Sequence, residues 1–352
     1  MYVYLENGDW YQGNTVSEGE ATAELVFTTN YTGYEENLTD PSFRGQALVF
    51  AYPLIGNYGV NRERFESDEV QPYAAIAREF DKSVYSLFQE EGIPAVDGID
   101  TRNLVTTIRD EGSMNCGIAD SKERAKELAF EDVDMTYPPR ENIEHRGTGT
   151  LNIVLLDCGV KESMLDKLAE AGARVIRVPW DFPKEKIAEY QPDLLFVSNG
   201  PGDPQAYESA IETIQYWEGR IPVSGICLGQ QLISLALGGS TTKMKFGHRG
   251  SNQPVYSEEL GRVRMTTQNH SYEVSELPDE LQITEYNVND ESIEGVKREE
   301  DGWNMQEKEN GYFSLQRVTP IVARQYHPEA NPGPNDSEDF FEEVISIAQN
   351  FQ

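Results

Sequence analysis

The sequence is poor in basic residues. Its 352 residues include 29 lysines and arginines against 61 aspartates and glutamates, which gives a formal net charge of −32 at pH 7. Binding to nucleic acid or to an anionic membrane needs cationic patches that neutralise phosphate groups. The charge balance therefore argues against nucleic acid and membrane lipid as the main partners.

Cysteines and long apolar runs are also scarce. Three cysteines, Cys116, Cys158 and Cys227, form an odd set without a CxxC pair, so we predict neither a disulfide framework nor a metal site. No apolar run approaches the ~18 residues of a membrane span. The first residues, MYVYLENGDWYQG, lack the basic and then apolar order of a signal peptide. We therefore expect a cytoplasmic protein.

The chain is longer than a typical domain with a single hydrophobic core, so we expect two domains. The first part mixes short β-rich runs, turn signals and the amphipathic stretch YAAIAREFDKSVYSLFQEEG (73–92), which indicates a mixed α/β domain. Residues 134–150 are rich in Pro, Gly and charge, as linkers are. We predict an N-terminal domain over residues 1–145, with the linker at its end, and a second domain over 146–352.

The second half alternates apolar strands with helical patterns. This order predicts an α/β fold whose sheet is mostly parallel and is flanked by helices on both faces. One predicted helix ends before Gly172 and has apolar residues at Val160, Met164, Leu165, Leu168 and Ala169. A closing helix presents Phe340, Phe341, Val344, Ile345 and Ala348 on one face. Active sites of such folds lie at the carboxyl ends of the strands.

The stretch GICLG (225–229) places Cys227 between two glycines, after the apolar run IPVSGI and before a helical pattern. Flanking glycines permit a sharp turn from strand to helix, because no Cβ obstructs the close backbones. A cysteine at a helix N-terminus is favoured as thiolate, since the unpaired N–H groups carry partial positive charge. Cys227 is therefore our candidate nucleophile, whereas Cys116 and Cys158 are interpreted as small buried residues.

A thiolate nucleophile needs a general base, and the chain contains only four histidines. His327 stands in ARQYHPEA, where Pro328 favours extended backbone, so that His327 and Glu329 project to the same side. A carboxylate can fix the tautomer of the imidazole and stabilise its charged form. Cys227, His327 and Glu329 thus form a candidate catalytic triad. HPE alone is a weak motif, and an ordinary surface pair is the alternative.

The loop SNGPGDP (198–204) lies at the end of another predicted strand. Its glycines, Gly200 and Gly202, allow substrate to approach the backbone, and their N–H groups could form an oxyanion hole with the amide of Leu228. By itself the loop would be an ordinary turn.

Together these motifs resemble the class I glutamine amidotransferases. Within them the chain is similar, over nearly its whole length, to the family of small, glutamine-hydrolysing subunits of carbamoyl phosphate synthetase. The segments that carry this likeness are TGYEENLTDPSFRGQ, YPLIGNYGVN, VDGIDTRNLVTTIRDEG, SNGPGDP, GICLGQQL, KMKFGHRGSNQPV and TTQNHSYEV.

The resemblance implies hydrolysis of L-glutamine through a thioester on Cys227, with His327 as acid and base and Glu329 as its orienting group. It further implies that glutamine is held by Ser42, Gly200, Gly202, Leu228, Gln231, Asn269, Ser271 and Tyr272. The ammonia would pass to the large subunit of carbamoyl phosphate synthetase in a heterodimer. No cofactor is expected in this chain, since ATP and Mg²⁺ would bind the large subunit and no GxxxxGK[ST] loop is present.

The chain departs from the usual family pattern near the expected glutamine pocket. Gln230 and Ser271 replace a histidine and a glycine, and Arg249, Ser251 and Gln253 stand where His, Gly and His are usual. None of these changes touches the triad. His248 and His270 keep their motif context and are interpreted as structural or as supports for the pocket rather than as the base, and His145 as a solvated linker residue.

Three alternatives stay open from the sequence. The chain could be the glutamine amidotransferase subunit of another synthase, although such subunits lack the first domain. It could be a non-catalytic regulatory homologue, against which the complete triad argues. It could also be a cysteine hydrolase of peptides, which would be active without a partner.

We predict that salt stabilises the protein. The acidic residues occur in pairs along the whole chain, such as Glu35 with Glu36 and Glu258 with Glu259, which is typical of an acidic surface adapted to high salt. Salt would screen the mutual repulsion of these carboxylates. The thermal unfolding midpoint should therefore rise between dilute buffer and molar KCl. An unchanged midpoint would contradict this prediction and would indicate that the acidic residues serve solubility alone.

Overall fold

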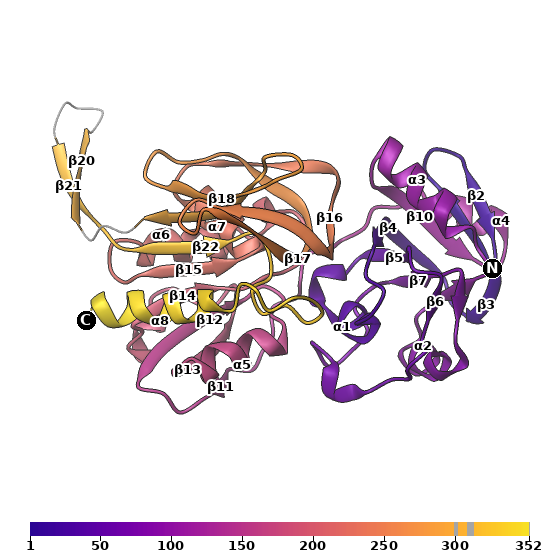
Figure 1. Cartoon of the computed structure of the whole chain (residues 1–352), viewed down its shortest axis with the longest axis horizontal. Helices are drawn as coiled ribbons and strands as arrows, with labels where there is room; N and C mark the ends of the chain where they lie inside the picture. Colours follow the sequence, from indigo (N-terminus) through magenta and orange to yellow (C-terminus); the bar gives the residue numbers. More distant parts are fainter. Residues whose placement is uncertain (299–301, 308–312, 352) are drawn as a thin grey trace.

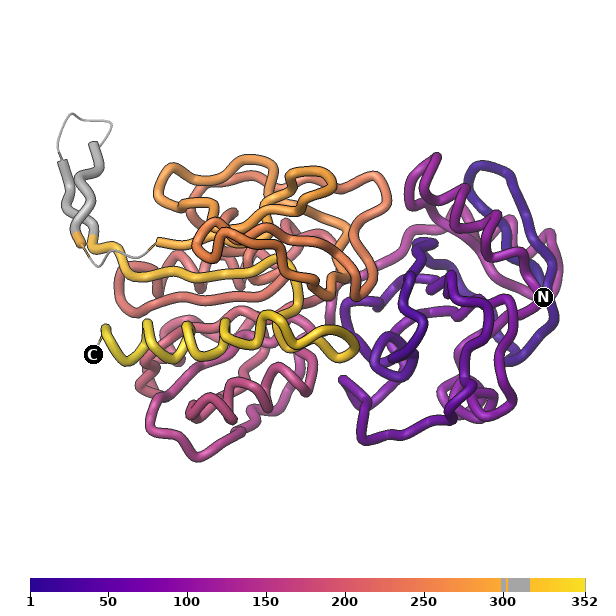
Figure 2. Tube along the Cα trace, viewed as in Figure 1, coloured from indigo at the N-terminus to yellow at the C-terminus, as the bar shows by residue number. Residues whose placement is uncertain are grey.

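The computed structural model describes residues 1–298, 302–307 and 313–351. Two lobes lie side by side, each built on one large sheet, and the N- and C-termini lie at opposite ends of the molecule (Figure 1). The tube in Figure 2 shows the chain crossing between the lobes after helix α4 (Lys122–Leu128). No described helix combines the length and the apolar character that a membrane crossing requires.

The first lobe contains an eight-stranded mixed sheet. Four consecutive strands, β4, β5, β7 and β9, are parallel, and the other pairings are antiparallel. The strand order is β2 (Trp10–Gln12), β1 (Tyr2–Leu5), β10 (Met114–Ala119), β4 (Ala21–Thr28), β5 (Gln46–Phe50), β7 (Ala74–Ile76), β9 (Ala95–Asp97), β3 (Asn14–Ser17). This lobe also contains α1 (Tyr34–Thr39), α2 (Tyr85–Glu91), α3 (Thr101–Glu111), α4, the short pair β6 (Leu54–Ile55) with β8 (Glu79–Phe80), and three 3₁₀ helices at Pro41–Phe43, Arg62–Arg64 and Lys82–Val84.

The amphipathic stretch 73–92 divides into different elements. Its first half forms β7 and β8, and only its second half forms the helix α2. Residues Ala74–Ile76 are buried in the middle of a parallel sheet. A strand that is buried on both faces shows no period-two alternation, so its pattern cannot be told from that of a buried helix.

The second lobe contains a ten-stranded sheet. The order is β11 (Glu144–Arg146), β13 (Ala173–Pro179), β12 (Leu151–Asp157), β14 (Leu194–Val197), β15 (Val223–Ile226), β22 (Ile321–Arg324), β19 (Ile293–Arg298), β18 (Gln282–Asn287), β16 (Ser240–Ser257), β17 (Arg262–Glu276). Strands β13, β12, β14, β15 and β22 are mutually parallel, which is the predicted α/β part. A separate hairpin of β20 (Gly302–Glu307) and β21 (Phe313–Val318) projects from this lobe (Figure 1).

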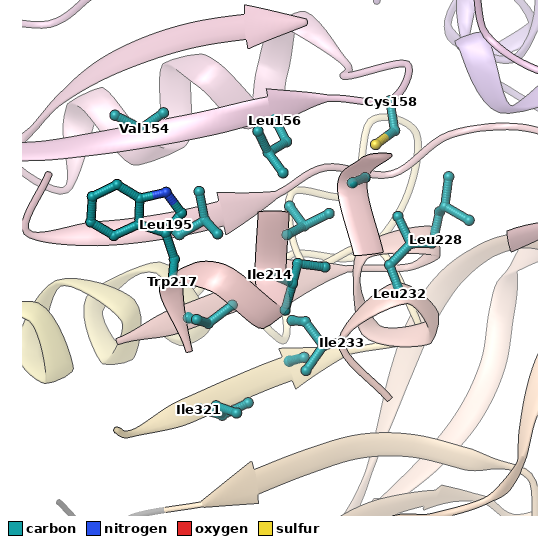
Figure 3. Packing of buried hydrophobic residues seen from close by; sticks show 14 of the residues in the cluster. Val154, Leu156, Cys158, Leu195, Ile214, Trp217, Leu228, Leu232, Ile233 and Ile321 are labelled. Carbon is teal, nitrogen blue, oxygen red and sulfur yellow. The ribbon is translucent and has the colours of Figure 1, made fainter. Parts of the chain in front are cut away.

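Helices cover both faces of this sheet, as predicted. On one face α6 (Glu208–Trp217) and α7 (Leu228–Ala236) pack on side chains such as Leu156 and Leu195, as Figure 3 shows. On the other face α5 (Glu162–Glu170) and α8 (Asp339–Phe351) pack on Ile153 and Leu155. The five apolar positions predicted for the closing helix are all buried in α8. The mixed α/β fold class is therefore confirmed.

Two features of the second lobe differ from the sequence analysis. The parallel strands are extended by an antiparallel ribbon, the long pair β16 and β17, which the sequence patterns did not indicate. In addition, β11 lies within the predicted linker yet pairs with β13. It is an edge strand held by ion pairs of Arg146 with Glu144, Glu162 and Asp166, so its sequence is charged and lacks an apolar pattern. The predicted domain boundary at residue 145 stays a prediction.

We predict that α7 depends on its apolar face for stability. Leu232 is fully buried against the sheet (Figure 3), so Leu232→Ala should lower the free energy of unfolding by about 2–5 kcal/mol. Urea titration followed by tryptophan fluorescence measures this change. The matched control is Leu260→Ala, because Leu260 is 42% exposed and its truncation should change stability by less than about 0.5 kcal/mol. Equal effects of the two changes would contradict this account of the packing.

Candidate active site

Cys227 occupies a strained turn between a strand and a helix. Strand β15 ends at Ile226, Cys227 has a φ of 55°, and α7 begins at Leu228. A Cβ added to Gly229 would lie 2.2 Å from the carbonyl oxygen of Val197, so no larger residue fits there. The elbow predicted from GICLG is confirmed, and a positive φ at a non-glycine residue is typical of functional sites.

The fold brings Cys227, His327 and Glu329 to one edge of the sheet. Cys227 follows β15 and His327 follows β22, the neighbouring parallel strand. The Nδ1 atom of His327 lies 2.7 Å from Oε1 of Glu329. All three residues are buried, with exposures of 3% or less. The predicted triad members therefore form one cluster at the carboxyl ends of two adjacent strands.

The opposite charges in this cluster stabilise one another. Burial by itself lowers the pKa of His327, but the Glu329 carboxylate and the neighbouring Cys227 thiol more than offset this and raise the pKa to about 10. For Glu329 the effects are reversed. Burial by itself raises the pKa of the carboxyl group, but the charges of Lys161 and His327 lower it to about 2. At neutral pH the site thus contains an imidazolium beside a carboxylate.

The sequence analysis missed Lys161. This fully buried side chain extends from the loop after β12, and its Nζ lies 3.1 Å from Oε1 of Glu329. The same Nζ donates to the carbonyl oxygens of Ala330, at 2.7 Å, and Asn331, at 2.9 Å. Opposite charges raise the pKa of Lys161 despite its burial. Its place at the carboxyl end of a parallel strand, in DCGVK, was the available signal.

The first lobe also approaches the triad. Glu66 is buried at the boundary between the lobes, where one carboxylate oxygen accepts hydrogen bonds from the backbone N–H of Ser163, at 3.1 Å, and from its hydroxyl, at 2.7 Å. Burial raises the pKa of Glu66 to about 7, although the Lys161 charge acts in the opposite direction. The hydrogen bonds of Glu66 to Ser163 therefore join the two lobes in the neighbourhood of Lys161 and Glu329.

A small cavity of about 20 Å³ lies beside Cys227. Of the eight residues expected to hold glutamine, seven line it: Ser42, Gly200, Gly202, Gln231, Asn269, Ser271 and Tyr272. The eighth, Leu228, is the first residue of α7 and directly follows Cys227. The volume is about that of a single water. The cavity must therefore widen before an amino acid can enter.

Hydrogen bonds across the two lobes hold the cavity walls. Asn269 Nδ2 donates to Asp40 Oδ2 at 2.8 Å, and Asn199 Nδ2 donates to Ser42 Oγ at 3.0 Å. Within the second lobe, Gln231 Nε2 donates to the carbonyl oxygen of Tyr272 at 2.7 Å. Asp40 and Ser42 belong to the first lobe, so both lobes build the site. The role of each residue toward a ligand stays a prediction.

Further residues line the cavity beyond those expected to hold glutamine. They are Glu24, Gln46, Met135, Pro201, Arg249 and His270. Glu24 and Gln46 lie in β-rich runs whose sequence carries no site motif. Arg249 was visible only as a departure from the usual pattern in FGHRG.

The other cysteines and histidines are structural in character. Burial raises the pKa of Cys116 to about 12 and that of Cys158 well above its usual value, as expected for inert thiols. His145 is exposed on β11. These residues lie outside the triad cluster.

His248 and His270 belong to a buried hydrogen-bond network. His248 Nε2 lies 2.7 Å from Asp290 Oδ2, and the ring nitrogens of His270 lie 2.8 Å from the carbonyl oxygen of Tyr272 and 3.1 Å from Gln268 Oε1. The two histidines and Glu294 have potential metal-ligand atoms within 4.8 Å of one another. Because protein groups already engage these ring nitrogens, we interpret the group as support for the cavity wall.

Comparison with protein families gives two matches. Residues 154–347 match the model described as "Glutamine amidotransferase class-I". Residues 3–118 match the model described as "Carbamoyl-phosphate synthase small chain, CPSase domain". The first match covers the lobe that carries Cys227 and His327, and the second covers the first lobe.

Curated relatives match along nearly the whole chain. A protein of Halobacterium salinarum is 46% identical over 360 residues, which cover 99% of this chain and 96% of the relative. A protein of Archaeoglobus fulgidus is 42% identical over 370 residues, which cover 99% and 98%. One of Staphylococcus epidermidis is 36% identical over 372 residues, which cover 100% and 96%. All three are named "Carbamoyl phosphate synthase small chain".

We predict strong coupling between Lys161 and Glu329. Lys161→Met leaves a buried carboxylate without its ammonium partner and should lower the free energy of unfolding by about 3–5 kcal/mol. Adding Glu329→Gln removes the uncompensated charge, so the double variant should regain part of this loss. A double-mutant cycle at pH 7 measures the coupling. Additive effects of the two changes would show that the contact contributes no interaction energy.

Proposed function

The chain belongs to the family of carbamoyl phosphate synthase small chains, and from this we propose that it hydrolyses L-glutamine to glutamate and ammonia and delivers the ammonia to a large synthetase subunit. The observation that carries the proposal is the buried cluster of Cys227, His327 and Glu329 beside a cavity of the expected composition. The class I glutamine amidotransferase match over the second lobe supports this chemistry.

The first half of the reaction uses Cys227 as nucleophile. The thiolate attacks the side-chain amide carbon of glutamine, and a tetrahedral intermediate forms. His327 is protonated at neutral pH, because its pKa is about 10, so it can donate its proton to the departing nitrogen. The C–N bond breaks, ammonia leaves, and a γ-glutamyl thioester remains on Cys227.

The second half returns the enzyme to its starting state. His327, now neutral, takes a proton from water, and the resulting hydroxide attacks the thioester carbon. The C–S bond breaks, glutamate is released, and the thiolate and the imidazolium are restored. Glu329 fixes the ring of His327 through the 2.7 Å contact at Nδ1, which leaves Nε2 to serve Cys227. The sum is one glutamine and one water converted to one glutamate and one ammonia.

The elbow gives the tetrahedral oxyanion its expected partners. Gly200 lies against Leu228, since a Cβ on Gly200 would come within 2.9 Å of the Leu228 side chain. The N–H groups of Gly200, Gly202 and Leu228 are the donors we propose for this oxyanion. Removal of such a donor typically costs about 10²- to 10³-fold in rate.

The large subunit is proposed to bind ATP and Mg²⁺, and this chain to act with it as a heterodimer. The first lobe supports such a partnership, since it matches the small-chain model and not only the general amidotransferase model. The chain is then a glutaminase subunit, and the acceptor of its ammonia lies on the partner. No step of glutamine hydrolysis requires a cofactor in this chain.

We predict that Cys227→Ala separates the two activities. Without the sulfur no thioester can form, so glutamine-dependent carbamoyl phosphate synthesis by the complex should fall to background. Synthesis from free ammonia should be unaffected, because it needs only the large subunit. Both rates are measured as carbamoyl phosphate formed by the reconstituted complex.

The control for this variant is Cys116→Ala, the same substitution at a buried cysteine in the first lobe. It should retain both activities. Loss of ammonia-dependent synthesis in Cys227→Ala would mean that the change disturbs the complex rather than the chemistry. Retention of glutamine-dependent synthesis would contradict the proposed nucleophile and favour a non-catalytic homologue.

A further inference from the structure

Arg249 lies in the wall of the cavity with one of its donors unused. It sits on β16 opposite Asn269 of β17 and is 5% exposed. Its Nη1 donates to the carbonyl oxygen of Phe246 at 2.8 Å, and its Nη2 donates to the hydroxyl of Ser271. Within the described part of the chain, its Nε has no hydrogen-bond partner. A buried donor left unpaired is unfavourable, and in a ligand cavity it points to a ligand.

Arg249 also lacks a direct ion-pair partner in the described part of the structure. The nearest acidic residue of the cavity, Glu24, pairs with Lys243 at 2.6 Å and accepts a hydrogen bond from Gln46 at 2.9 Å. Among residues 1–298, 302–307 and 313–351, no carboxylate forms an ion pair with Arg249. Desolvation lowers the pKa of Arg249 to about 10, which leaves it charged at neutral pH. Glu24 and Cys227 act on this charge without a direct ion pair, and a buried guanidinium in that position is retained at a free-energy cost.

Resting on the proposed function, we propose that Arg249 binds the α-carboxylate of glutamine through the edge formed by its Nε and Nη2. These two N–H groups point in parallel and match the two oxygens of a planar carboxylate. The Nε–H group has no partner among the described residues, and Nη2 donates to the neutral hydroxyl of Ser271. A charged carboxylate oxygen accepts a stronger hydrogen bond than this hydroxyl does. Ser271 is thereby a support that orients the guanidinium until substrate arrives.

The thiolate of Cys227 is the other anion that Arg249 could serve. A single sulfur offers one acceptor, so it gives no reason for a planar fork with two donors on one side. Cys227 Sγ already lies 3.7 Å from Gln325 Nε2. Its counter-charge comes from His327. The carboxylate is therefore the better match in both shape and charge.

The two charges of an amino acid have complementary groups on this wall. Arg249 supplies the positive charge for the carboxylate, and Glu24, which also pairs with Lys243, places a carboxylate on the same cavity for an α-ammonium group. Both residues are buried, at 5% and 2% exposure. The wall thus selects a free amino acid over a glutamine residue inside a peptide, whose α-groups are neutral amides.

The test compares Arg249→Gln with the unchanged chain, using the full-length protein together with its large subunit. Two substrates are assayed for ammonia release: L-glutamine, and L-glutaminamide, in which a neutral amide replaces the α-carboxylate. We expect Arg249→Gln to raise the KM for L-glutamine about 10- to 100-fold and to change kcat less than about threefold. The preference of the unchanged chain for L-glutamine over L-glutaminamide should fall by a similar factor.

Two controls separate carboxylate binding by Arg249 from a role as counter-ion of the Cys227 thiolate. Arg102→Gln is the same substitution at an exposed helix position and should leave the KM unchanged. Alkylation of Cys227 by neutral iodoacetamide should proceed at the same rate in Arg249→Gln. Slower alkylation with an unchanged KM would overturn the proposal in favour of a thiolate counter-ion. An unchanged KM and an unchanged preference would overturn it outright.

A second variant tests the proposal if Arg249→Gln does not fold. If circular dichroism shows that Arg249→Gln does not fold, Arg249→Lys keeps the charge but loses the fork, and it should raise the KM by a smaller factor with the same loss of preference. An unchanged KM in that variant overturns the proposal. If the unchanged complex fails to hydrolyse L-glutamine, the proposed function itself fails, whereas activity without an Arg249 effect defeats only the present inference.

Discussion

The active cluster depends on one buried carboxylate oxygen. Oε1 of Glu329 lies 2.7 Å from His327 Nδ1 and 3.1 Å from Lys161 Nζ, so a single atom orients the base and receives a buried ammonium. Two cations, Lys161 and the imidazolium of His327, thus lie beside one carboxylate. These opposite charges explain how the buried groups persist without solvent, since an uncompensated buried charge is strongly destabilising. They also fix the charges of Glu329 and His327 over a wide pH range, because the two pKa values lie near 2 and 10.

The first lobe contributes more than a separate fold, because it completes the polar contacts of the second. Asp40 accepts the amide of Asn269, Ser42 accepts that of Asn199, and Glu66 accepts both donors of Ser163. In the isolated second lobe these amides would lose their partners and meet water. The site is thus an interface between two sheets, and the arrangement of the lobes determines its shape. An amidotransferase domain alone would have the triad but not this cavity.

The sequence predicted the elements that follow simple patterns. The elbow at Cys227 was visible because glycines flank one reactive side chain, and the α8 face because its apolar positions follow the helical period. The buried strand at 74–76 and the edge strand at 144–146 were missed, since one lacks alternation and the other is polar throughout. Lys161 was missed, and Arg249 was noted only as a departure from the usual pattern, for a different reason. Their significance arises from neighbours that are distant in sequence, and a single lysine or arginine carries no motif.

The size of the cavity limits how the site can work. About 20 Å³ holds one water, whereas glutamine is many times larger, so the described structure is closed to substrate. Most of the walls belong to strands and helices whose backbone hydrogen bonds resist displacement. Met135, like Gly200, Pro201 and Gly202, lies outside any helix or strand, and it belongs to the segment that crosses between the lobes. Its backbone lies against Gly202 and its side chain against Gly45, one from each lobe. A displacement of Met135 therefore couples the opening of the cavity to the relative position of the two lobes.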